Sequence, residues 1–283
     1  MPRTDGRLAI QLAYDSKTKR TQLHVLEQRQ PLKVVRAFHL DGDTALIHLH
    51  NLSGGVLAED RLSFDIAVED GARAQITSTS ATRVYRSRTS AGAAECTTKV
   101  RLGMNSLLEY LPDPLIPFAG ARYSQHVTID TCDGAGLFWW ETLAPGREAR
   151  GELFAYDSLR IRFEIHARGI PIAIENAHLN PAARPLASIA RLGPYRYLST
   201  FYICRVGLSQ ETWVRLEKHL LELATGMCTP VITWGLSRLP AHGLVVRALS
   251  QSNRDIARGL MCFWRAAKQE LYGQEPVVPR KIY

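Results

Sequence analysis

The sequence lacks the short motifs of the common enzyme and nucleotide-binding classes. No glycine is followed by lysine anywhere in the 283 residues, which excludes the GK[ST] core of a phosphate-binding loop. The chain also has no HExxH, no GxSxG and no GxGxxG after a strand. These absences exclude the familiar zinc-protease, serine-nucleophile and dinucleotide-binding sites.

Cysteine pairs and long apolar runs are missing as well. The five cysteines stand far apart and form no CxxC pair, which argues against a disulfide framework or a zinc knuckle, so most are expected to be buried thiols. No stretch approaches about eighteen uncharged apolar residues. The segment from Met1 to Asp15 has no charged region followed by an apolar one, as a leader would. We therefore expect a cytoplasmic protein with no membrane span.

Lysine is scarce relative to arginine, although the net charge is +8 and the pI about 9.4. A basic chain of this kind suits an anionic partner, either a nucleic acid or a carboxylate-rich protein. The arginines are scattered among acids instead of forming a stripe with aromatic residues. This distribution favours ion pairs and protein interfaces, and it disfavours the nucleic-acid alternative.

Short alternating segments fill the chain from Leu8 to about Ile174, for example "ALIHLHNL", "RLSFDIAV", "HVTIDT" and "LRIRFEIHA". Apolar residues at every second position between Gly, Asp and Pro predict many short strands, and no helical period appears. Gly71, Gly103 and Gly134 recur about 31 residues apart, each expected to end one strand and open another. This spacing indicates either stacked β-coils or a β-sandwich of repeated hairpins.

The C-terminal part is different. "LSQETWVRLEKHLLELATG" has Ser209 as an N-cap, apolar residues at helical spacing and a stop at Gly226. A second helix is predicted from Ser252, with Asp255 in a capping-box-like position, to Gly273. "VITWGL" and "GLVVRAL" between them read as strands. We expect one domain over 1–283, with a β-rich body at about 8–207, helices and intervening strands at about 208–273, and a tail at 274–283.

The segment "HNLSGGVLAEDRLSFDI" combines a glycine pair with an acidic pair. One interpretation is a tight turn in which Gly54 or Gly55 takes positive φ and Asp60 bonds the turn backbone. The other is a site where bare backbone lets a partner or ion approach carboxylate oxygens. His48 and His50 share a strand face just before it, but two imidazoles are too few ligands for a closed metal site.

Two further segments carry unusual side chains. In "LEYLPDPLIPFAGARY" three prolines exclude a helix or a central strand, and Leu115, Ile116 and Phe118 would form either a rigid plug or a stiff partner-binding ridge. In "LFWWETL" the carboxylate of Glu141 follows two tryptophans. Such a group is expected to have a raised pKa, and with Glu109 or Glu152 it would form a glycosidase-like pair if the two converge.

These segments together resemble a known family. "NLSGGVLAEDRL", "TSATRVYRS", "LEYLPDPLIPFAGARYSQ", "PGREARGE" and the terminal "VPR" look like the urease accessory protein family UreD, also called UreH. The resemblance is collinear from about Pro31 through Glu175 and extends through "GLVVRALSQS" and the last helix. One departure is Glu59, which stands where the family usually has glycine, whereas Asp60 matches.

The resemblance implies a mainly β protein with a β-helical, solenoid-like body and two C-terminal helices. It also implies a non-catalytic maturation chaperone that binds apo-urease and the accessory proteins UreF and UreG. No tightly bound cofactor is implied, and nickel would be present only in transit. The alternative from the residues alone is a β-solenoid carbohydrate-active enzyme that uses paired carboxylates.

Isolated acids in apolar strands suggest where nickel would pass. Unpaired charge in such strands is costly unless water or a cation is present. Carboxylates also bind nickel more loosely than imidazole or thiolate, which suits release. We therefore predict that some of Asp60, Glu109, Glu141 and Glu175 face a wet interior path, and that Leu115, Ile116 and Phe118 or the last helix contact the helical accessory protein.

Overall fold

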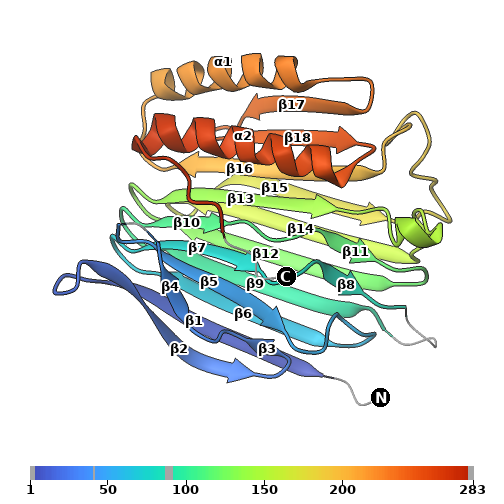
Figure 1. The fold of residues 1–283 in the computed structure, drawn as a ribbon, viewed down its shortest axis with the longest axis horizontal. Coiled ribbons are helices and arrows are strands. Elements are labelled where there is room, and N and C mark those ends of the chain that lie inside the picture. Colours follow the sequence, from blue (N-terminus) through green and yellow to red (C-terminus); the bar gives the residue numbers. More distant parts are fainter. Residues whose placement is uncertain (1–3, 41, 87–91, 280–283) are drawn as a thin grey trace.

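The structure is a computed structural model that describes residues 4–40, 42–86 and 92–279. Two β-sheets pack against each other, and two helices cover the outer face of the second sheet (Figure 1). The end of the predicted tail, 280–283, lies outside the described residues.

The first sheet has seven strands in the described part of the chain. In spatial order they are β15 (Ile170–Leu179), β14 (Ser158–Ala167), β12 (Arg122–Thr131), β9 (Ala94–Leu102), β6 (Arg61–Val68), β1 (Asp5–Asp15) and β2 (Arg20–Arg29). Neighbours from β14 to β1 run parallel, whereas β15 and β2 pair antiparallel at the two edges.

The second sheet has eleven strands over the same described ranges. Its main order is β17 (Ile232–Arg238), β18 (Gly243–Ser250), β16 (Tyr197–Arg205), β13 (Gly136–Leu143), β10 (Leu107–Tyr110), β7 (Arg73–Ser78), β5 (Ala45–Asn51) and β3 (Leu32–Lys33). Three short strands join its margin: β4 (Ala37–His39), β8 (Thr82–Val84) and β11 (Leu115–Pro117).

The chain alternates between the two sheets through the three glycine turns. Gly71 joins β6 to β7, Gly103 joins β9 to β10, and Gly134 joins β12 to β13, as the repeat predicted. The turns stack on one another, because Gly71 N donates to Met104 O at 2.9 Å and Asn105 N donates to Asp133 O at 2.9 Å. Parallel pairing inside and antiparallel pairing outside make both sheets mixed and open. A mainly β fold is therefore confirmed, but a solenoid is not shown.

The two predicted helices are present. Helix α1 (Gln210–Met227) begins after Ser209, whose Oγ accepts a hydrogen bond from Thr212 N at 3.3 Å. Helix α2 (Asn253–Tyr272) ends at Gly273 in the left-handed conformation, with φ +63°. Ser252 precedes α2 but makes no side-chain cap bond, so the predicted capping box is wrong. A one-turn 3-10 helix, Glu148–Arg150, follows β13.

Two apolar cores lie on opposite faces of the second sheet. Strand β13 shows the division, because Leu137 and Trp139 pack between the sheets while Phe138 and Trp140 pack under the helices. Successive side chains of a strand point to opposite faces, so a strand buried on both sides is apolar almost throughout. This explains the "GLFWW" run, and it makes Glu141 the next residue on the inter-sheet face.

The structure bears on three predictions made from the sequence, on the proline-rich segment, the cysteines and membrane spans. Leu115–Pro117 is a short strand that pairs with β8 and, at Leu115, with β13, so the prolines do not keep it out of the sheet. All five cysteines are free, as expected, but Cys132, Cys228 and Cys262 are exposed, and the expectation that most are buried is wrong. No helix in the described ranges combines the length and apolar character needed to cross a bilayer.

Candidate functional site: a cavity between the sheets

A cavity of about 150 Å³ lies between the sheets on the side of β5, β8 and β11. Its deep wall carries Cys96 of β9, Tyr123 and Gln125 of β12, and Trp139 and Glu141 of β13. Its other wall includes Gly54, Gly55, Leu115 and the segment 78–82. The cavity therefore brings together three sequence-predicted positions, Glu141, the glycine pair and Leu115.

Glu141 is the acidic group of the deep wall. Gln125 Nε2 donates to its Oε1 at 2.7 Å. Burial raises the pKa of the Glu141 carboxyl to about 7, because the charged form loses solvation, and the charge of Glu175 adds to this. The hydrogen bond from Gln125 opposes the rise. Glu141 thus changes charge near neutral pH, as the sequence analysis expected of a carboxylate beside indoles.

The other titratable groups of the deep wall stay neutral at pH 7. Burial raises the pKa of the Cys96 thiol to about 11, and it raises the pKa of Tyr123 well above its ordinary value. Tyr110 stacks on Trp139 with ring centroids 3.8 Å apart and closes one side. Cys96, Gln125 and Tyr123 were not predicted as site residues from the sequence. The alternation of "RYSQHVTI" was the available signal, since Tyr123, Gln125 and Val127 fall on one strand face.

Glu109 does not reach the cavity. It lies on the opposite face of the second sheet, fully buried under α2, with Lys268 Nζ 2.7 Å from Oε1. Trp264 Nε1 donates to Oε1 at 3.2 Å, and Gln75 Nε2 donates to Oε2 at 3.3 Å. Burial raises the pKa of Glu109, while the Lys268 ammonium opposes that rise. This carboxylate fastens α2 to the sheet.

Glu175 lies on edge strand β15 and pairs with Arg247 of β18, so it links the two sheets outside the cavity lining. The ion pair neutralises much of its charge. Its side chain is 31% exposed. Glu175 is nevertheless close enough to raise the pKa of Glu141 through charge repulsion.

The glycine and acid segment is a turn with a second role for Gly55. Gly54 has φ +71°, and a Cβ on Gly55 would lie 2.4 Å from Cε2 of Tyr85. Asp60 is 2% exposed and accepts from Leu57 N at 2.8 Å and Thr4 N at 3.3 Å. The predicted turn role of Asp60 is confirmed, and its carboxylate is not among the cavity-lining groups.

Glu59 occupies a left-handed position, with φ +66°. This conformation is costly for a residue with a Cβ, so glycine would fit the position with less strain. Its side chain points away to accept from Gly92 N at 3.3 Å. Glu59 therefore holds a positive-φ position in the turn, and its carboxylate is not among the cavity-lining groups.

The predicted ridge is half-buried. Leu115 packs against the inter-sheet core. Phe118 meets the ring of Tyr85 edge-on, with centroids 5.0 Å apart, and lies under the Arg147 guanidinium at 4.4 Å. Ile116 lies between them in β11 and is partly exposed. All three side chains are thus partly exposed.

Neither a closed metal site nor one of the two predicted glycosidase pairs is assembled in the described residues. They contain no group of three or more His, Cys, Asp or Glu side chains arranged to hold a metal ion. His50 lines the cavity, and burial lowers its pKa, whereas His48 packs edge-on against Phe38. Glu109 is on the wrong sheet face to pair with Glu141, and Glu152 is bound to Arg147. The paired-carboxylate alternative therefore has no support.

Comparison with known proteins agrees with the resemblance seen in the motifs. The family model described as "UreD urease accessory protein" matches residues 5–282. The urease accessory protein UreD of Herpetosiphon aurantiacus is 46% identical, with 100% of this chain and 98% of that protein covered. UreD of a Bacillus species (strain TB-90) is 27% identical, over 96% and 97% of the two chains.

A third relative, UreD 2 of Brucella abortus strain 2308, is 28% identical over 93% of this chain and 88% of its own length. The match to the family model and the alignment with the Herpetosiphon protein both run over nearly the whole chain. This chain belongs to the UreD family of urease accessory proteins.

Proposed function

We propose that the protein is a cytoplasmic, non-catalytic chaperone of urease maturation that acts as a single domain. In this proposal it binds apo-urease and the accessory proteins UreF and UreG, and it helps deliver nickel to the urease active site. The winding of the chain between two stacks of parallel strands supports describing the body as solenoid-like.

One observation carries the nickel proposal: a cavity between the sheets holds a carboxylate with no cationic partner among the described residues. Gln125 Nε2 donates to Glu141, no Lys or Arg in the described residues forms an ion pair with it, and burial raises its pKa to about 7. A hydrated cation would favour the charged form and be held by oxygen alone. Loose oxygen coordination suits an ion in transit, which must enter and also leave.

We limit the proposed nickel path to Glu141 and its neighbour Glu175. Asp60 and Glu109 are engaged in a turn and in an ion pair, away from the cavity lining. The Cys96 thiol also lines the cavity, and it stays neutral at pH 7. A neutral thiol suits an ion in transit, because a thiolate would hold nickel tightly.

The test is urease activation from purified components, with the nickel content of urease measured alongside its activity. Glu141→Gln keeps the shape of the side chain and should reduce nickel incorporation severalfold at limiting nickel. Glu152→Gln, on the Arg147 pair outside the cavity, is the matched control and should leave incorporation unchanged. Full incorporation by a folded Glu141→Gln protein would refute the path. Failure of the wild-type protein to bind any of the three partners would refute the chaperone role.

The proposed contact of Leu115, Ile116 and Phe118 with UreF has its own test. Ile116→Asp places a charge on the partly exposed position of β11 and should abolish co-purification with UreF without unfolding the chain. Retained binding would move that interface elsewhere on the molecule.

A further inference from the structure

The exposed side of α2 is a single-signed surface. Arg254, Arg258 and Arg265 are exposed along it, with Met261, Cys262 and Gln269 between and beside them. We call these six residues the α2 ridge. At 3.6 residues per turn the three arginines lie within a narrow stripe, and their Cα atoms span about 16 Å along the helix axis.

The ridge carries no acid to balance its charge. Within the described residues, Arg254 and Arg258 have no ion pair, and Arg265 meets only Glu275 of the tail at 3.4 Å, with both side chains more than 60% exposed. A pair this exposed contributes little. Asp255 lies at the margin of the ridge, and Glu270 faces α1, where it binds Arg215 and His219.

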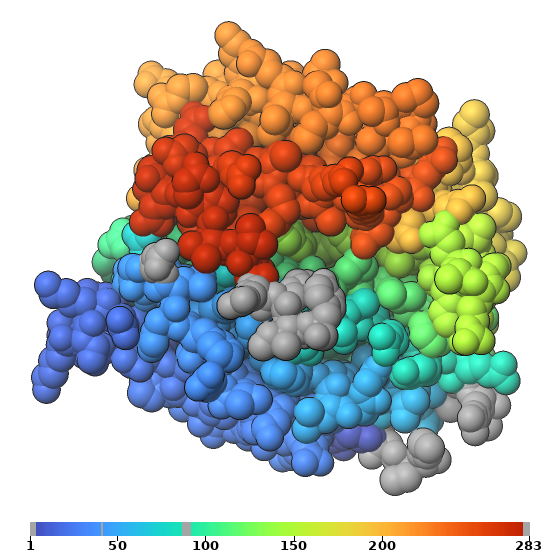
Figure 2. Space-filling model, viewed as in Figure 1, coloured from blue at the N-terminus to red at the C-terminus, as the bar shows by residue number. Residues whose placement is uncertain are grey.

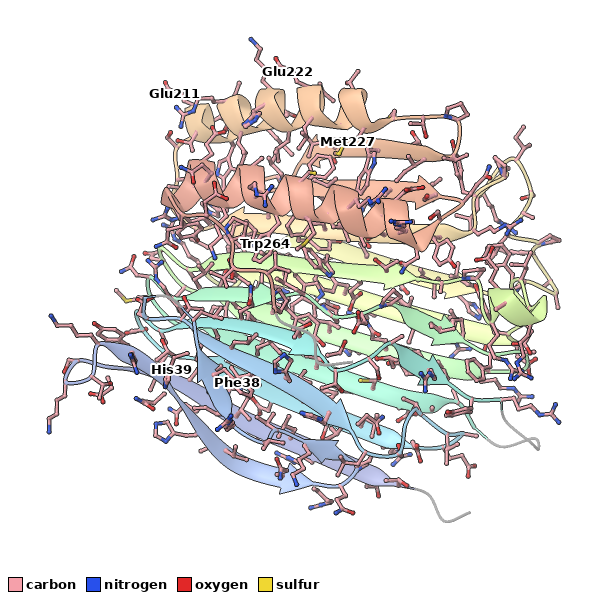
Figure 3. All side chains as sticks on the ribbon, in the orientation of Figure 1. Phe38, His39, Glu211, Glu222, Met227 and Trp264 are labelled. Carbon is pink, nitrogen blue, oxygen red and sulfur yellow. The ribbon has the colours of Figure 1, made fainter. Side chains whose placement is uncertain are left out.

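Helix α1 shows what an ordinary solvated helix of this protein looks like. Its exposed positions mix signs, with Glu211 and Glu222 as well as Arg215 and Lys218. Figure 3 shows Glu211 and Glu222 pointing away from the molecule at its upper edge. Mixed signs stabilise a free helix surface through pairs one turn apart, whereas like charges at that spacing destabilise it. The arginines of the α2 ridge therefore repel one another, and a partner that carries negative charge would reduce this repulsion.

The ridge is also held rigidly. The opposite side of α2 is buried through Ile256, Leu260, Phe263 and Trp264, and Lys268 is tied to Glu109 beneath it. In the space-filling view α2 forms an open part of the molecular surface above the tail (Figure 2). A rigid helix loses little conformational entropy when it docks.

We propose that the α2 ridge is the docking surface for a carboxylate-bearing helix of a protein partner. Arginine is enriched at protein interfaces and lysine is depleted there, and the α2 ridge has three exposed arginines and no lysine. The guanidinium fork binds a carboxylate through two parallel hydrogen bonds. Acidic residues at the same one-turn and two-turn spacings on a partner helix would match all three arginines. The proposal rests on the proposed function, which places the protein inside a complex.

The experiment reverses the ridge charge in the full-length chain. The variant Arg254→Glu, Arg258→Glu, Arg265→Glu is compared with a control that reverses three exposed arginines elsewhere, Arg20, Arg150 and Arg160. Dissociation constants for purified UreF, UreG and apo-urease are measured at low and high salt. The ridge variant should bind one partner about a hundredfold more weakly at low salt, because like charges then face each other. The control should stay within a few-fold of wild type.

The outcomes separate the two proposals. A milder Arg→Gln version of the ridge variant should give an intermediate loss, and circular dichroism with urea unfolding checks that all variants fold. Unchanged binding of all three partners by the reversed ridge overturns this inference and leaves the chaperone role standing. Loss of binding only to duplex DNA or to anionic vesicles also overturns it. No binding by the wild-type protein would overturn the proposed function itself.

Discussion

Two glutamates on neighbouring strands of the second sheet differ in their partners and in their titration. Glu109 of β10 points under α2, where Lys268, Trp264 and Gln75 surround its carboxylate. Glu141 of β13 points between the sheets into a cavity, where Gln125 is its hydrogen-bond partner. The same side chain is a fastener on one face and a titratable group on the other, so the partner supplied by the fold decides its chemistry.

Removing the carboxylate of Glu109 should give the largest effect. Glu109→Ala leaves the Lys268 ammonium buried without a counter-charge, which should lower the free energy of unfolding by about 3–5 kcal/mol. Urea unfolding at pH 7 measures this change. The double variant Glu109→Met, Lys268→Met is the control and should recover much of the loss, because no charge remains buried. If the free energy of unfolding of the single variant fell by less than about 1 kcal/mol, water would have access to the Glu109–Lys268 pair.

Changing Glu141 should instead alter the pH dependence of stability. Its pKa is about 7 in the folded chain against 4.5 ordinarily, so the folded protein holds a proton that the unfolded chain releases between these values. Holding this proton stabilises the folded state relative to high pH. The contribution is fully present below about pH 4.5 and is lost as the pH rises through about 7, which lowers the free energy of unfolding by about 3 kcal/mol. Glu141→Gln cannot titrate and should lack this component.

The measurement for Glu141 is urea unfolding of both proteins from pH 5 to pH 8. The wild-type protein should lose stability relative to Glu141→Gln across that range, since other groups titrate alike in both. A constant difference between the two curves would show that Glu141 is ionised throughout and that its cavity is well hydrated.

Gln125 should give the smallest effect of the three. Gln125→Leu removes the donor to Glu141 Oε1, which favours the charged form, so the pKa of Glu141 should rise further. The loss of stability should then occur at higher pH than in the wild-type protein. At pH 8 the free energy of unfolding of Gln125→Leu should be about 1–2 kcal/mol lower than that of the wild type. Carboxyl-labelled NMR titration follows the pKa directly. Ser124→Ala, on the other face of β12, is the neutral control.

Local sequence was enough for most of the elements and for two of the helix caps, Ser209 and Gly273. Alternation predicted the strands, Ser209 and Gly273 bounded the helices, and Gly71, Gly103 and Gly134 marked the passages between sheets. These signals work because hydrogen bonding at helix ends and left-handed φ values at turns involve residues close in sequence. The motif stretches also carried the family resemblance, which the whole-chain comparison confirmed.

Sequence by itself therefore determined that this protein is a β-rich chain with two amphipathic helices, and that Glu141 sits among apolar neighbours. Only the tertiary structure decided that Glu109 faces Lys268, 159 residues further along the chain, while Glu141 accepts a hydrogen bond from Gln125 at the wall of a cavity. A strand buried on both faces carries apolar residues on each side, so its sequence does not show which face packs between the sheets and which packs under the helices. That choice comes from which strands and helices pack together, and it determines the charge that each carboxylate meets.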